Sequence, residues 1–157
     1  MTKRTGETLT EYLTPRLFGP LGITKYYWET CPKGITKGGW GLFLCAEDMA
    51  KLGQLYLQRG KWNGQQLVSE YWIEISTARH LKTQNDTYGY GYQLWMEQRP
   101  GSFEYSGMLG QNVIIYPDMD MVSIGPDLEY PHSPDERVNI HSVQNIWEFI
   151  TATLERI

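Results

Sequence analysis

The stretch Phe103–Pro117 holds the residue types and the spacing that could line a reaction site. It predicts a short strand ending at Tyr105 and Ser106, a glycine-bearing turn that begins at Gly107, and a second strand over residues 113–116 with both faces covered. Small residues beside an aromatic ring, at a sharp turn between strands, let a ligand approach the backbone closely. The alternative interpretation is an ordinary hairpin.

Ser106 carries a hydroxyl, and a serine acts as a nucleophile only when a neighbouring base activates it. No base stands near Ser106 in the sequence, which argues against Ser106 as a nucleophile in its own right. Asp48, at the start of a predicted helix, suits the positive end of the helix dipole better than a catalytic role.

Composition excludes several classes of protein. The 157 residues are 41% hydrophobic and 20% charged, with a net charge of −4 and scattered Lys and Arg, so we expect no nucleic-acid partner. No apolar run reaches membrane-spanning length and no signal peptide is visible. The three histidines belong to no metal motif, and Cys31 and Cys45 have no metal-ligand spacing, although a bridge between them stays open. We expect neither a metal nor a cofactor.

The elements that must position this stretch follow from periodicity. A capping box at Thr8 and Glu11 predicts a helix that Pro15 ends or kinks, and residues 25–37 show no clear period. Further elements are predicted as a helix over 46–59 with Gly60 just past its end, a turn at 63–64, a helix from 69 to 75, one strand over 88–96, a strand over 121–124, a loop over 128–137 and a helix from about 142. The glycine-rich segment 38–45 lacks the Gly-Lys-Ser/Thr of a phosphate-binding loop.

Five segments, in this order, resemble the C-terminal half of a serine hydrolase of the β-lactamase and penicillin-binding-protein superfamily. The match covers nearly the whole chain. The segments are Thr5–Leu13, Leu17–Ile23, Gly38–Leu42 with Ala46–Gly53, Tyr88–Trp95, and Tyr105–Gln111 with Val113–Pro117. The resemblance implies an α+β fold, with helices and loops first and then a three-strand antiparallel meander packed on helices.

The family's chemistry needs a Ser-x-x-Lys nucleophile and a second motif such as Tyr-x-Asn, and neither pattern occurs in this sequence. Both motifs normally lie upstream of the segments matched here. The resemblance therefore implies that residues 1–157 form a single partial domain, inactive alone, whose partners are the missing N-terminal half and a small acyl or peptide substrate. An unpaired sheet edge would make it self-associate. The family is usually exported from the cell.

The remaining motif implies roles for residues 105–108. Tyr105, Ser106 and Gly107 stand where the family has Lys-Thr-Gly or His-x-Gly, and the backbone N–H of Met108 would be an oxyanion-hole donor. A neutral phenol at Tyr105 cannot pair with a substrate carboxylate as a cation would, which favours ester, amide or peptide hydrolysis over a dedicated β-lactamase.

Gly39 and Trp40 would border the leaving-group side of the pocket, and a core position for Trp40 is the alternative. A rival function for the whole chain is a non-catalytic module that binds a peptide or a peptidoglycan fragment. A plain structural domain is the third interpretation, and it would hold if no concave pocket surrounds Tyr105.

Overall fold

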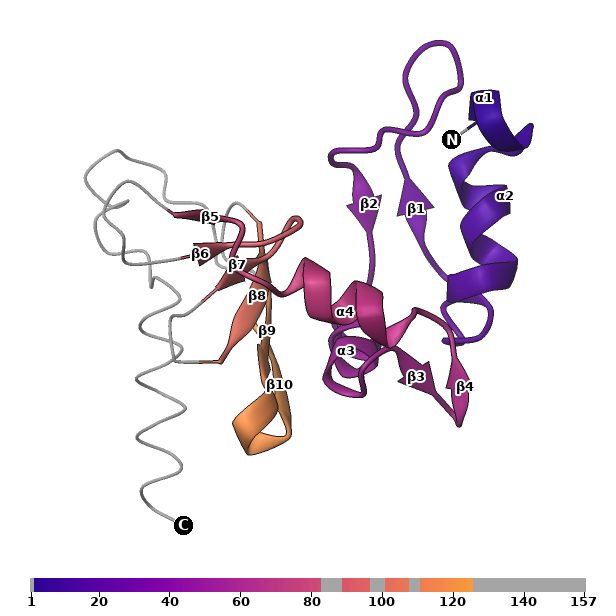
Figure 1. Ribbon diagram of the computed structural model, residues 1–157. Coiled ribbons are helices and arrows are strands. Elements are labelled where there is room, and N and C mark those ends of the chain that lie inside the picture. The colour runs from indigo at the N-terminus through magenta and orange to yellow at the C-terminus, as the bar shows by residue number, and fades with distance from the viewer. Residues whose placement is uncertain (1, 83–88, 97–100, 108–110, 126–157) are drawn as a thin grey trace.

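The computed structural model describes residues 2–82, 89–96, 101–107 and 111–125. In Figure 1, helices α3 and α4 lie between an antiparallel sheet on one side and the N-terminal helices with the β1–β2 hairpin on the other. The helices are α1 (Thr2–Thr5), α2 (Leu9–Leu13), the π-helical turn η1 (Thr14–Phe18), α3 (Ala46–Leu57), α4 (Glu70–Ser76) and the 3-10 turn η3 (Pro117–Met119). The strands are β1 (Tyr27–Trp28), β2 (Leu42–Phe43), β3 (Lys61–Trp62), β4 (Gln65–Gln66), β5 (Leu81–Lys82), β6 (Gly89–Tyr90), β7 (Trp95–Met96), β8 (Phe103–Ser106), β9 (Asn112–Tyr116) and β10 (Met121–Ile124). The α+β prediction is confirmed.

Helix α2 begins at the predicted capping box. The Thr8 hydroxyl accepts a hydrogen bond from the Glu11 backbone at 3.2 Å, and the Glu11 carboxylate accepts one from the Thr8 backbone at 2.8 Å. The α-helix ends at Leu13, just before Pro15, as predicted, and the chain continues as the π-helical turn η1, closed by Gly19 N–H donating to Thr14 O at 2.7 Å. Proline is tolerated there because the first turn of a helical segment leaves its N–H groups unpaired.

The irregular path predicted for residues 25–37 is wrong in part. Tyr27 in β1 pairs with Phe43 in β2, and their ring centroids are 5.6 Å apart, so residues 29–41 form the loop of a long hairpin. Hairpins are predicted from the short turn that joins their two strands, and a loop of this length contains no such signal.

Helix α3 begins at Ala46 as predicted, ends at Leu57, two residues earlier than predicted, and packs against the sheet at Gly53. A Cβ on Gly53 would lie 2.6 Å and 2.8 Å from methyl groups of Val122 and Val113, so only hydrogen fits between the helix and the strands. Leu55, two residues further along the helix, is also fully buried. Leu55 packs in a second core, with Phe18, Leu21 and Ile23. The helix therefore joins two cores and is buried on two faces.

Asp48 lies in the first turn of α3, as predicted, but it is buried rather than solvated. Its carboxylate accepts a hydrogen bond from Lys51 Nζ at 2.7 Å. This bond lowers the pKa of the Asp48 carboxyl, against the effect of burial, and the Cys45 thiol also hydrogen-bonds to it and adds to the lowering. The ion pair with Lys51 compensates the buried negative charge of Asp48 at the N-terminus of the helix. This agrees with a structural role for Asp48.

The β3–β4 turn and the start of α4 form as their local signals predict. Asn63 and Gly64 both have positive φ, 46° and 80°, as a two-residue hairpin turn requires. The Ser69 hydroxyl accepts a hydrogen bond from Trp72 N at 3.1 Å and caps α4.

The single strand predicted over 88–96 is wrong. The segment is two strands, β6 and β7, joined by a turn in which Gln93 has φ 63°. The turn is held against the end of α4, because Tyr92 N–H donates to Ser76 O at 3.0 Å. Gly91 permits this approach, since a Cβ there would lie 2.2 Å from the same carbonyl oxygen.

The sheet has six strands in the order β10-β9-β8-β7-β6-β5, each antiparallel to its neighbours. The predicted three-strand meander is its β8–β10 part. Every residue of β9 is buried, which confirms that this strand is covered on both faces. Leu94, Met96, Phe103, Val113 and Ile115 form the core of the sheet, beneath α3. The predicted loop over 128–137 and the helix from 142 lie outside the described residues.

Candidate active site

Tyr105 and Ser106 end strand β8 and point to opposite faces of the sheet, because successive strand side chains alternate. The Tyr105 ring packs edge-on against Tyr56 of α3, with centroids 5.4 Å apart and an interplanar angle of 85°. Ser106 is exposed, and its partner in the register is Asn112 of β9. The strand therefore anchors the phenol and presents the hydroxyl to solvent.

Gly107 begins the turn that follows. Its N–H donates to Gln111 O at 3.0 Å, and a Cβ at Gly107 would lie 3.2 Å from both that oxygen and the Gln111 Cβ. A side chain there would press on the other arm of the turn, which explains the glycine. Met108 lies outside the described residues, so its role as an oxyanion-hole donor stays a prediction.

Tyr105 is electrically neutral at physiological pH. Burial raises the pKa of its phenol well above the ordinary value of 10.0, and the adjacent Tyr56 phenol raises it further. Tyr105 can therefore donate or accept a hydrogen bond but cannot provide the cation that a lysine would at this place.

Ser106 has no activating base in the part of the chain that the structure describes, where no lysine, histidine or carboxylate hydrogen-bonds to its hydroxyl. A serine in this setting is not an activated nucleophile. The geometry agrees with the argument from the sequence, and the roles proposed for residues 105–107 stay predictions.

Gly39 and Trp40 lie in the β1–β2 loop, which Figure 1 places on the other side of α3 and α4 from β8. Trp40 is 70% exposed, so its alternative interpretation as a core residue is wrong. Lys37 Nζ lies 5.6 Å from the centroid of the Trp40 ring, within reach of a cation–π interaction. The described residues do not bring Gly39 and Trp40 together with Tyr105.

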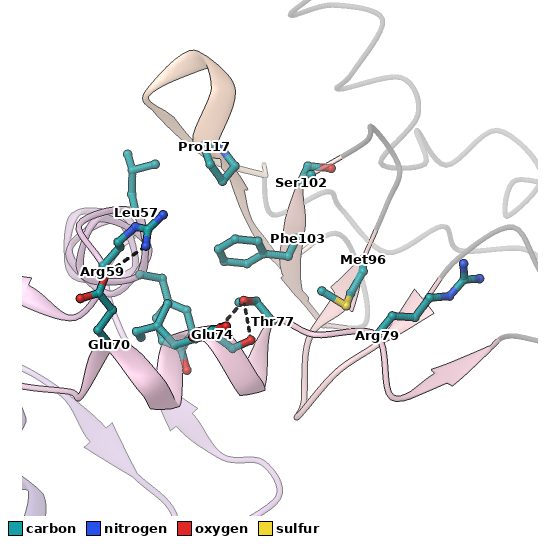
Figure 2. A pocket seen from close by; sticks show the side chains of 13 residues that line it. Leu57, Arg59, Glu70, Glu74, Thr77, Arg79, Met96, Ser102, Phe103 and Pro117 are labelled. Atoms are coloured by element: carbon teal, nitrogen blue, oxygen red, sulfur yellow. Dashed lines mark hydrogen bonds and ion pairs between the residues drawn. The ribbon is translucent and has the colours of Figure 1, made fainter.

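A pocket of about 370 Å³ lies beside Phe103 at the start of β8, and no sequence motif predicted it. Figure 2 shows it between α3, α4 and the strands, with Phe103 directed toward the helices. Its walls come from separate segments of the chain, so no local motif marks it. Tyr105, Ser106, Gly107, Gly39 and Trp40 are not among its lining residues.

Within the described ranges, no group of three His, Cys, Asp or Glu side chains could hold a metal ion, and no helix has the length and apolarity needed to cross a membrane. Cys31 and Cys45 are free thiols. This settles the question of their pairing in this structure.

The fold and the profile of the sequence define the class of protein. The Beta-lactamase family profile matches residues 1–124, and the chain belongs to that family. This confirms the resemblance that the sequence motifs indicated.

The solved structures that are similar to this chain include the following two. One is a putative 6-aminohexanoate-dimer hydrolase from Bacillus anthracis, with a TM-score of 0.75 and 26% identity, over 98% of this chain and 40% of that chain. The other is the unliganded simvastatin synthase (LovD) from Aspergillus terreus, with a TM-score of 0.61 and 16% identity, over 85% of this chain and 47% of that chain. The chain thus spans less than half the length of either protein.

A shorter similarity links the chain to a curated enzyme. Over 42 residues, 27% of this chain, it is 57% identical to the cytosol non-specific dipeptidase of Escherichia coli (strain K12), and this segment spans 9% of that enzyme. Because the match covers so small a part of the dipeptidase, it gives no ground for assigning the dipeptidase activity to this chain.

Proposed function

We propose that this chain belongs to one domain of a serine hydrolase that cleaves an ester, amide or peptide bond through an acyl-enzyme, and that it forms one wall of the catalytic cleft. The observation that carries the proposal is the end of β8, where an exposed Ser106 and a bare Gly107 follow the fixed Tyr105 ring. Membership of the Beta-lactamase family supports acyl transfer. The name of the Bacillus anthracis neighbour, a 6-aminohexanoate-dimer hydrolase, supports an amide substrate.

The wall would act on the substrate through positioning and charge stabilisation. An acyl group would lie along the backbone at Gly107, and the N–H of Met108 would donate to the oxyanion as it forms. Tyr105 would offer a neutral hydrogen-bonding group, in keeping with an uncharged ester or amide. The nucleophile and its base would come from sequence outside this chain, because Ser-x-x-Lys does not occur in it.

Intact-mass measurement after treatment with a fluorophosphonate tests this proposal. We expect no adduct on this chain, because Ser106 has no base to activate it. We expect one adduct on the longer product of the same gene, on a serine that precedes the residues of this chain. Replacing Gly107 with Val in the longer protein should slow labelling by at least tenfold, since a branched side chain would block the acyl path.

Two outcomes would contradict the proposal. Labelling of neither protein would favour the non-catalytic module that binds peptides. Labelling of this chain that Ser106→Ala abolishes would make Ser106 itself the nucleophile.

We also propose that the chain self-associates when alone. The β1–β2 hairpin exposes four large apolar side chains, those of Tyr27, Ile35, Trp40 and Phe43. Exposed apolar surface favours association. Sedimentation velocity should show concentration-dependent dimers or larger species. The double variant Tyr27→Ser/Phe43→Ser should shift the distribution toward monomer, whereas Tyr71→Ser, at an exposed tyrosine on α4, should not. A monodisperse monomer that melts cooperatively would contradict this expectation.

A further inference from the structure

The pocket at the start of β8 is lined by none of the residues proposed for the cleft, although Tyr56 lines the pocket and also packs against Tyr105. Its volume of about 370 Å³ falls in the range of sites for small molecules. Ile73 of α4, Met96 of β7 and Phe103 of β8 are buried and form an apolar base. Such a base suits an aliphatic chain or a ring.

The charged residues of the lining are not equivalent. Arg59 and Glu70 form an ion pair at 2.9 Å and neutralise each other. Glu74 lies one helical turn beyond Glu70 and is exposed, and within the described structure its carboxylate has neither an ion pair nor a hydrogen bond. Glu74 is thus an uncompensated negative charge beside the apolar base.

Arg79 is the remaining charge, and it lines the other end of the pocket. Its side-chain stem lies against β6, where a Cβ on Gly89 would come within 2.7 Å of the Arg79 Cγ. Figure 2 shows its guanidinium directed away from Phe103, and Arg79 has contacts of its own. It does not compensate Glu74 by an ion pair.

Aromatic rings add a second attraction for positive charge. Tyr56 and Phe103 stand in the wall with centroids 6.1 Å apart and rings tilted by 59°. The faces of aromatic rings attract cations. Both the free carboxylate and the rings therefore favour the same kind of ligand.

We propose that this pocket binds a small organic cation, a primary ammonium group carried on an apolar chain or ring. The ammonium group pairs with Glu74, and the apolar body rests on Ile73, Met96 and Phe103. The site does not depend on the hydrolase function, because none of the residues proposed for the cleft takes part in it.

Calorimetric titration of the full chain with three probes of one length tests the site. The probes are hexylammonium, hexan-1-ol and hexanoate, which share the six-carbon body and differ in charge. We expect hexylammonium to bind about tenfold more tightly than hexan-1-ol, as one charge-assisted hydrogen bond provides, and hexanoate to bind most weakly.

Variants identify the carboxylate. Glu74→Gln should weaken hexylammonium binding to the level of hexan-1-ol and leave hexan-1-ol binding unchanged. Glu47→Gln is the matched control, because Glu47 is an exposed glutamate in the first turn of α3, at the end of that helix away from the pocket. It should change the affinity for neither hexylammonium nor hexan-1-ol. Because Glu74 is exposed and unpaired, its variant should keep the melting temperature of the parent, which checks that it is folded.

Three results would overturn the proposal. The first is equal affinity of the chain for the three probes. The second is that the Glu74→Gln variant binds hexylammonium as tightly as the parent does. The third is that hexanoate binds more tightly than the other two probes and that Arg79→Gln abolishes this binding. The last result would make the pocket an anion site.

Discussion

Gly60→Ala is expected to lower the free energy of unfolding by about 3–5 kcal/mol. Gly60 lies two residues past Gln58, the C-cap of helix α3, and has φ 81°, a conformation that costs about 1–2 kcal/mol for a residue with a Cβ. A Cβ there would also lie 2.0 Å from Val68 O, so the backbone after β4 would have to move. That movement would disturb the bonds that Leu67 N–H and Val68 N–H donate to Gly60 O, at 2.9 Å and 3.2 Å.

Gly64→Ala is the matched control for this prediction. Gly64 has nearly the same conformation, φ 80°, but a Cβ on it would meet nothing within 4 Å. It should therefore show the conformational cost alone, about 1–2 kcal/mol. Urea unfolding followed by tryptophan fluorescence measures both variants, and equal losses would show that the collision at Val68 relaxes at no cost.

The second prediction concerns stability at alkaline pH. Burial raises the pKa of the Tyr105 phenol in the folded chain, and Tyr56 raises it further, whereas the unfolded chain titrates near 10.0. Above pH 10 the unfolded chain therefore binds fewer protons than the folded one, and the free energy of unfolding falls as pH rises. This stabilisation is complete below pH 10 and is lost as pH rises through the folded pKa.

Tyr105→Phe removes the titrating group and should flatten this part of the pH dependence. The difference in unfolding free energy between parent and variant, measured in urea from pH 7 to 12, should be constant below about pH 10 and should then move in favour of the variant. Tyr71→Phe, at a tyrosine that is 69% exposed, is the control and should follow the parent. An identical alkaline loss in Tyr105→Phe and the parent would contradict the prediction.

The sequence by itself determined the elements whose causes are local. Thr8 with Glu11, Ser69, and Asn63 with Gly64 each fix a helix start or a turn through contacts within a few residues. For the same reason β8, β9 and β10, joined by short turns, could be predicted as neighbours in the sheet. The order of the motifs identified the family, which the profile over residues 1–124 confirms.

The tertiary structure decided what depends on contacts between distant segments. The exposure of Trp40 and the burial of Leu55 depend on which surface packs against which core, and hydrophobicity alone does not specify that. Gly91 interrupts the predicted strand because the end of α4 lies against it. The pocket beside Glu74 has the same origin, since its lining comes from α3, α4, β7, β8 and the start of η3, which meet only in the folded chain.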